Sequence, residues 1–359
     1  MPRILISGEW LWRHYQEACA DALGRLGHEA IKFEWHSFFF DAGDNGEPHF
    51  RSFLAQRQNK YLIGPIISKI NRDLISISLD TRPDVIWLYN DTHILPRTIR
   101  KLKKELPKTV LAQYANDNPW GKNQSKIMWR HFRRSVPLFD INFFYRFENK
   151  GDLERAGARR TAILLPYFIP EDIYHIERDS IELQFRSDVV FVGHYENDER
   201  LKVLTRIAEE GIDLKIFGTD WNSAISTLPA GNPLKKLLPI KPARGQEYVK
   251  AICGSKIALA FLSKLNEDTY TRRNFEIPAM KSFMLGEYTK DLDSFFNEGA
   301  EAEYFRSDEE LLRKIRYYLG HSEKIDEIAS NAFERVRKDG HDVVSRMRQF
   351  MSDIHTVRG

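Results

Sequence analysis

The sequence predicts an α/β protein made of two doubly wound domains, and three observations carry this prediction. Short apolar runs alternate with amphipathic helical segments, which is the pattern of parallel sheets covered by helices. The alternation stops in the polar stretch 168–186, FIPEDIYHIERDSIELQFR, and then starts again. A chain of 359 residues also exceeds what one hydrophobic core usually supports.

The first series opens as strand, helix and strand, with RILIS at 3–7 and EAIKFEW at 29–35. Such a βαβ opening predicts a parallel sheet that binds ligands at the carboxyl ends of its strands. The turn after the first strand, SGEW, lacks the glycines of a dinucleotide fingerprint and better suits an acceptor-side loop. The further expected strands are 84–90, 109–117, 140–146 and 162–167, and the expected helices are 12–26, 63–79 and 95–106.

The second series begins with the strand DVVFVGHYEN, which turns at Gly193. A helix is expected over 200–210, a strand in DLKIFGTDW and a buried strand over 256–262, and the tail from Asp308 is helical. The predicted division is a first domain at 1–172, a linker at 173–186, a second domain at 187–340 and a final helix within 341–359.

Composition narrows the classes of protein. The formal net charge is only +3, which gives no argument for a nucleic-acid partner. The sequence has neither a long apolar window nor a signal peptide at MPRILISGEW, so a cytoplasmic protein is expected. The two cysteines, Cys19 and Cys253, fall in different domains and are expected to be buried thiols.

The stretch 268–289, DTYTRRNFEIPAMKSFMLGEYT, concentrates the chemistry that a nucleoside diphosphate sugar requires. Its phosphates need cations or helix N-termini, and its ribose hydroxyls need a carboxylate acceptor. Arg272 and Arg273 supply the cations and Glu276 the carboxylate. The alternatives are an ion pair of the arginines with Asp268 or Glu267, and a Glu276 that only complements a helix dipole.

Four segments together resemble the spore-protein CgeB-like glycosyltransferases, a branch of the GT-B enzymes that use nucleotide sugars. They are TRRNFEIPA, MLGEYT, DLDSFFNEGAEAEYFRSDEELLRKIRYYL and SDVVFVGHYENDER. The resemblance is specific over the C-terminal half and general over the N-terminal half. It implies two facing Rossmann-like domains with a cleft between them, and a last helix, 343–354, that crosses back onto the first domain.

The resemblance also implies an activity. A sugar would pass from a nucleotide diphosphate donor to a glycan, lipid-linked or protein acceptor, with no metal and no other cofactor. Many GT-B enzymes carry two acidic residues separated by seven others, of which the second holds the ribose and the first faces the sugar. Asp268 and Glu276 match this pair, although Asp268 stands where the family usually has Glu.

Further donor-site candidates follow strand ends of the second domain. Arg200, behind the Gly193 turn, is a third phosphate candidate, with a surface position at a helix start as the alternative. Glu287 and Thr289 end a strand where a helix begins, so the N–H groups of Tyr288 and Thr289 are candidate diphosphate ligands. The alternative is a plain turn capped by Asp291.

A catalytic base would lie at the carboxyl end of a strand of the first domain. The candidates are Glu9, His93 and Asp117, each with a structural role as its alternative; Asp117 would then hold an Asx turn before Pro119. An enzyme that retains the anomeric configuration needs no such base, and the acidic pair at 268 and 276 leans towards retention.

The segment KIMWRHFRRSV, 126–136, interleaves basic and aromatic residues. One interpretation is a face that touches the inner surface of an anionic membrane or a lipid-linked acceptor. The alternative is a solvated basic helix whose aromatic side chains lie in the core.

Two other functions stay open from the sequence. A GT-B sugar epimerase would need carboxylates and a histidine converging on one site. A non-catalytic glycan- or nucleotide-binding protein would keep the fold without turnover. Asp268 leaves this possibility open, and so does Lys281, a position where relatives often have Gly.

Overall fold

The computed structural model describes residues 1–42 and 48–358, which form two compact units. The first unit joins Met1–Leu165 to Val343–Gly359, and the second is Pro166–Asp342. The stretch expected as a linker belongs to the second unit. Phe168 N–H donates to the His341 carbonyl at 3.0 Å, and Phe185 is buried, so these residues are fastened to that unit.

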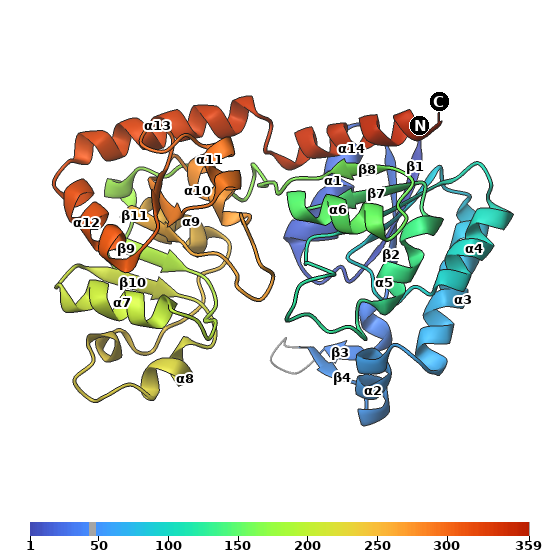
Figure 1. The fold of residues 1–359 in the computed structure, drawn as a ribbon, viewed down its shortest axis with the longest axis horizontal. Coiled ribbons are helices and arrows are strands. Elements are labelled where there is room, and N and C mark those ends of the chain that lie inside the picture. The colour runs from blue at the N-terminus through green and yellow to red at the C-terminus, as the bar shows by residue number, and fades with distance from the viewer. Residues whose placement is uncertain (43–47, 359) are drawn as a thin grey trace. The chain divides into compact units, whose positions relative to one another are not determined.

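The first unit is built on a six-stranded parallel sheet of order β2-β1-β5-β6-β7-β8 (Figure 1). Its strands are β1 Arg3–Gly8, β2 Glu29–Glu34, β5 Val85–Tyr89, β6 Val110–Ala115, β7 Ile141–Phe144 and β8 Thr161–Ile163. All residues of β5 and β6 are buried. Apolar residues dominate these central strands because both faces of the sheet are covered.

Helices cover this sheet, and a small antiparallel hairpin, β3 Phe40–Ala42 with β4 Pro48–Phe50, lies apart from it. The helices are α1 Ala18–Arg25, preceded by a π-turn at Arg13–Glu17, α2 Phe53–Tyr61, α3 Pro65–Thr81, α4 Pro96–Glu105, α5 Arg130–Ser135, α6 Phe147–Arg155 and α14 Val343–Arg358. Helix α14 packs on this sheet from the far end of the sequence. Its Phe350 ring stacks on Trp87 of β5 with centroids 4.2 Å apart.

The second unit has a five-stranded parallel sheet of order β10-β9-β11-β12-β13. Its strands are β9 Ser187–Val192, β10 Leu214–Phe217, β11 Ser255–Ala260, β12 Met284–Glu287 and β13 Glu303–Phe305. Its α-helices are α7 Arg200–Glu209, α8 Trp221–Ser226, α9 Gln246–Cys253, α10 Arg273–Ala279, α11 Lys290–Phe295, α12 Asp308–Leu319 and α13 Ser322–Lys338. The predicted α/β fold with two parallel-sheet domains is therefore confirmed.

Short 3-10 turns complete the chain, at His36–Phe38, Val136–Leu138, Arg178–Ser180, Leu183–Phe185 and Pro233–Leu237. Both cysteines are buried, as expected. Across residues 1–42 and 48–358, none of the helices combines the length and the apolar character that crossing a membrane requires.

Candidate functional site

The candidate donor site lies at the carboxyl ends of the strands of the second unit, where open parallel sheets bind ligands. Glu276 of α10 is 5% exposed, and both of its carboxylate oxygens have partners. Arg272 Nε lies 2.8 Å from Oε1, and the Tyr248 hydroxyl donates to Oε2 at 2.8 Å. Two carboxylate oxygens accept about four hydrogen bonds, so Glu276 keeps acceptor capacity for further hydroxyl groups.

Tyr248, on α9, is a member of this cluster that sequence reasoning missed. Burial, followed by the charge of Glu276, raises the pKa of Tyr248, so its hydroxyl stays protonated and acts as a donor. The residue stands 28 positions before Glu276 in the sequence. It falls inside an ordinary amphipathic helix, so no local pattern marks it.

Arg273 lies against the turn that follows β9. Its Nη1 donates to the Val192 carbonyl at 3.0 Å, and its guanidinium carbon sits 5.6 Å from the centre of the Phe191 ring. A Cβ atom on Gly193 would lie 2.5 Å from Nη1, so this close approach requires glycine. Arg273 Nε is buried and has no hydrogen-bond partner among the described residues. Burial lowers the pKa of Arg273, which means that an anion beside it would stabilise its charge.

Arg200 fits neither of the two roles expected from the sequence, a phosphate ligand or a surface residue at a helix start. It is 3% exposed, so it is not a surface residue. Its guanidinium binds both carboxylate oxygens of Asp198 at 2.8 Å and donates to the carbonyls of His194 and Leu262 at 3.0 and 3.3 Å. These bonds connect the segments that follow β9 and β11, and the geometry favours a structural role over phosphate binding.

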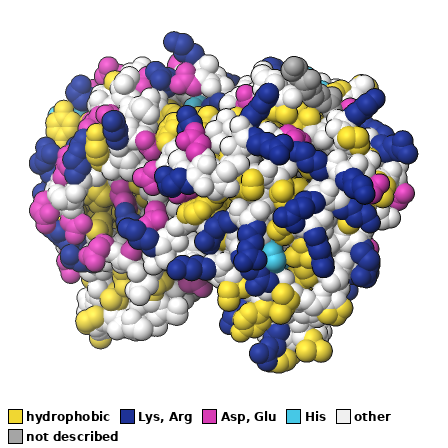
Figure 2. All heavy atoms as spheres, turned by 45° about the vertical axis from the view of Figure 1, so that its right-hand side comes forward, with side chains coloured by type: hydrophobic (Ala, Val, Ile, Leu, Met, Phe, Trp, Pro, Cys, Tyr) yellow, Lys and Arg dark blue, Asp and Glu magenta, His cyan; other side chains and the backbone are white. Residues whose placement is uncertain are grey.

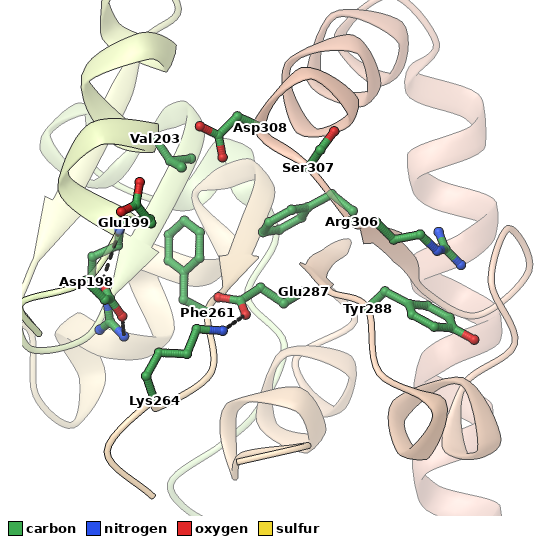
Figure 3. A pocket seen from close by; sticks show the side chains of 12 residues that line it. Asp198, Glu199, Val203, Phe261, Lys264, Glu287, Tyr288, Arg306, Ser307 and Asp308 are labelled. Atoms are coloured by element: carbon green, nitrogen blue, oxygen red, sulfur yellow. Dashed lines mark hydrogen bonds and ion pairs between the residues drawn. The ribbon is translucent and has the colours of Figure 1, made fainter. Parts of the chain in front are cut away.

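Glu287 and Tyr288 line a cavity of about 270 Å³ at the ends of β11, β12 and β13. Glu287 points to Lys264 and pairs with it, while Arg306 lies over the Tyr288 ring with its guanidinium carbon 3.8 Å from the ring centre (Figure 3). The Tyr288 N–H donates to the Phe305 carbonyl at 2.9 Å. The sequence suggested that this N–H group binds a diphosphate, but in the structure it is used in a hydrogen bond to the neighbouring strand.

Thr289, rather than Asp291, caps α11. Its hydroxyl accepts from Leu292 N–H at 3.0 Å and donates to the Thr269 carbonyl at 2.6 Å. The second bond fastens the loop that carries Asp268 to the start of α11. Asp268 is half-buried in that loop, and its N–H donates to the Ser263 carbonyl at 3.0 Å.

In the first unit, Glu9 and Asp117 come together at the carboxyl edge of the sheet. Glu9 follows β1 and Asp117 follows β6, two strands on either side of β5. Burial raises the pKa of Glu9, and the charges of Asp117 and Glu34 raise it further. Asn90, which follows β5, donates to Asp117 Oδ2 at 3.1 Å. This pair is the candidate acceptor-side group.

His93 fits its structural alternative. It is 4% exposed and its ring stacks on Trp35 with centroids 3.8 Å apart. Its Nε2 lies 2.7 Å from Asn59 Oδ1. Burial lowers the pKa of His93 to about 3, so the ring is neutral and packed in the core. A base that must reach an acceptor hydroxyl does not suit this position.

The basic and aromatic segment 126–136 also follows its structural alternative, because its aromatic side chains are core residues. Trp129 is 1% exposed and Phe132 is 4% exposed. Both belong to the cluster beneath α5 and are unavailable to a membrane.

Comparison with solved structures shows the same two-domain GT-B architecture. Sucrose-phosphate synthase of Thermosynechococcus elongatus aligns with a TM-score of 0.71 at 10% identity, over 99% of this chain and 100% of that chain. HepE of Anabaena, in complex with UDP and glucose, aligns at 0.68 and 12% identity over the same shares. Trehalose 6-phosphate synthase of Burkholderia multivorans aligns at 0.67 and 11% identity, over 99% of each chain.

A family model matches part of the sequence. Residues 200–352 match a family described as glycosyl transferase-like. These residues therefore form a glycosyltransferase-like domain within a chain that has the GT-B fold. The predictions of fold and enzyme class are thereby confirmed. No curated protein matches this chain in sequence.

Proposed function

We propose that the donor, a nucleoside diphosphate sugar, binds around α10. Glu276 accepts hydrogen bonds from the ribose hydroxyls, and Arg272 and Arg273 meet the phosphates. The observation that carries this proposal is a buried carboxylate beside two arginines, one of which keeps a buried Nε without a hydrogen-bond partner among the described residues. Because the HepE structure holds UDP and glucose, a UDP-sugar is the first donor to test.

The transfer proceeds without a divalent cation in this proposal. Negative charge develops on the leaving diphosphate, and preorganised guanidinium groups can stabilise it in the place of a metal. The acidic pair at Asp268 and Glu276 supports retention of the anomeric configuration. Glu9 and Asp117 then orient the acceptor hydroxyl, and no catalytic base is required.

The acceptor is a glycan, a lipid-linked saccharide or a protein, and the enzyme works as a cytoplasmic protein at the inner face of a membrane. The segments around Glu276 support placing it in the CgeB-like branch of GT-B enzymes. These assignments rest on the resemblance of the C-terminal half and on the basic surface of the first unit.

A ligand screen by thermal unfolding tests the donor site. Stabilisation would be measured with UDP, GDP, TDP, CDP and ADP and their sugars, with and without EDTA, since a ligand that binds the folded state raises its stability. Glu276→Gln is expected to lower the affinity about 10-fold to 100-fold, the effect of losing a hydrogen bond to a charged group.

Glu303→Gln is the matched control. Glu303 is also 5% exposed and is also held by a tyrosine and a cation, with Tyr318 at 2.6 Å and Lys314 at 2.5 Å. The Glu303→Gln variant should be less stable than the unchanged protein, but nucleotides should still stabilise it against thermal unfolding. Stabilisation that disappears with EDTA would contradict metal independence, and no response to any nucleotide would overturn the donor site and favour the non-catalytic alternative.

A further inference from the structure

The first unit carries a strongly cationic face. Helices α2, α4 and α5 contain ten Lys and Arg residues and one acidic residue, Glu105. Figure 2 shows Lys and Arg side chains gathered over this part of the molecule, with a group of hydrophobic side chains at its lower end. Such an imbalance on one face attracts anions.

A cavity of about 400 Å³ opens on this face, between the first turns of α3 and α4 and the helix α5. Its lining combines two chemistries. Leu62, Ile67 and Leu95 supply apolar wall, whereas Arg97, Arg100 and Arg134 are exposed guanidinium groups. The side chains of these three arginines have no hydrogen-bond or ion-pair partner among the residues that the structure describes.

Polar side chains of α5 hold the wall of the cavity. Arg130 donates to the carbonyls of Tyr61 and Leu62 at 2.6 and 3.1 Å, which fixes the turn between α2 and α3. His131 lines the cavity and is 8% exposed. Its Nδ1 is buried without a hydrogen-bond partner within the described parts of the chain. One buried polar atom of the cavity wall is thus left unsatisfied, which is uncommon in folded proteins.

Exposed apolar side chains occur at the cavity and along α2, the helix that ends beside it. Ile63 lines it and is 60% exposed, and the neighbouring helix α2 presents Phe53 and Leu54, which are 66% and 68% exposed. Cations beside exposed apolar side chains are typical of a surface that lies in the interface of an anionic bilayer. The apolar component therefore comes from α2 and Ile63, not from the aromatic residues of 126–136.

We propose that this face docks on an anionic phospholipid bilayer, with a lipid phosphate held by Arg97, Arg100 and Arg134 in the cavity. Phe53, Leu54 and Ile63 enter the headgroup region beside it. This inference rests on the membrane location in the proposed function and gives it a site, but it does not depend on the donor site.

Vesicle sedimentation of the full chain tests the proposal. The protein should bind vesicles of phosphatidylcholine with about one third phosphatidylglycerol, and not vesicles of phosphatidylcholine alone. Each basic residue near such a surface adds about 1 kcal/mol. The triple variant Arg97→Glu, Arg100→Glu, Arg134→Glu should thus lose about 100-fold or more in affinity.

A second triple variant, Lys236→Glu, Lys324→Glu, Lys338→Glu, changes the net charge equally on exposed residues of the second unit. It should bind as the unchanged protein does. The variant Phe53→Ser, Leu54→Ser should bind more weakly than Leu183→Ser, a change at a residue that is 77% exposed elsewhere. Stabilisation by UDP should persist in every variant that is folded.

Three results would overturn the proposal. One is equal loss of binding in both triple variants, which would indicate a net-charge effect alone. Another is absence of binding to anionic vesicles by a protein that still responds to UDP. The third is complete competition by inorganic phosphate at equal ionic strength, which would assign the cavity to a soluble phosphate.

Discussion

Asp91 is a buried carboxyl group at the carboxyl edge of the first sheet that sequence reasoning did not select. It accepts from the Ser7 hydroxyl at 2.5 Å and from the His93 N–H at 3.0 Å. Burial is the largest influence and raises the pKa of Asp91 to about 6. The folded protein therefore holds a proton more tightly at this residue than the unfolded chain does.

This difference predicts a pH dependence of stability. A raised carboxyl pKa means that the free energy of unfolding falls as pH rises from about 4 to about 6, by up to about 3 kcal/mol. In Asp91→Asn this contribution is absent, so the variant should gain stability relative to the unchanged protein over that range. Urea unfolding at both pH values would measure the free energy of unfolding of each protein. A difference in this free energy that is the same at both pH values would contradict the raised pKa of Asp91.

At the residue scale, the sequence could predict those members of the candidate site that are neighbours in the chain. Arg272, Arg273 and Glu276 occupy one helical turn, so local spacing was sufficient. Tyr248 reaches Glu276 from another helix, so only tertiary packing brings the two together. In the first unit, tertiary packing likewise brings the cavity arginines of α4 and α5 to one place. Arg200 was ambiguous because the sequence does not show whether a carboxylate, here Asp198, takes up its donors.

At the scale of elements, the end of β9 and the start of α10 approach each other through Gly193. A side chain there would meet Arg273 Nη1 at 2.5 Å and the Phe191 ring at 2.8 Å. Gly193→Ala should displace the guanidinium and weaken nucleotide binding about tenfold, the loss of one charge-assisted hydrogen bond. Isothermal titration with UDP would measure the change.

Gly286→Ala, in β12, is the control for this prediction. A Cβ atom there would meet its nearest neighbour, the Ala260 carbonyl oxygen, at an ordinary 3.6 Å. This variant should therefore bind UDP normally. Equal effects of the two substitutions would show that the approach of Arg273 to Gly193 does not matter for binding.

The strands were predictable because the central strands are short segments rich in apolar residues that lie between turn residues. The helices α7, α12 and α13 were predictable from their amphipathic period. Helix α2 was not, because FLAQRQNKY has no apolar stripe and the helix exposes Phe53 and Leu54. Its start depends instead on the Ser52 hydroxyl, which accepts from Ala55 N–H at 3.1 Å.

At the scale of the whole molecule, the first unit depends on α14. Phe350 is fully buried between Trp87 and Phe143, with ring centroids 4.2 and 4.8 Å away. Phe350→Ala should cost about 3–5 kcal/mol of stability. Hydrogen exchange followed by mass spectrometry should show lost protection in β5 and β7 but not in β9 or β11.

The exposed Phe53, changed to Ala, is the control and should leave exchange in β5 and β7 unaltered. Loss of protection throughout both units in Phe350→Ala would contradict the division of the molecule at Leu165 and Val343. Unchanged protection in the first unit would contradict the importance of α14 for its core.

The interrupted first unit has a consequence for the order of events on the ribosome. The second unit is one continuous segment, Pro166–Asp342, and all its strands have been synthesised before α14 emerges. The first unit begins synthesis earlier but lacks the helix that covers Trp87 until Val343–Arg358 is translated. The half of the enzyme that is made first is therefore the half that is completed last, and its apolar sheet face is the surface that chaperones would have to shield meanwhile.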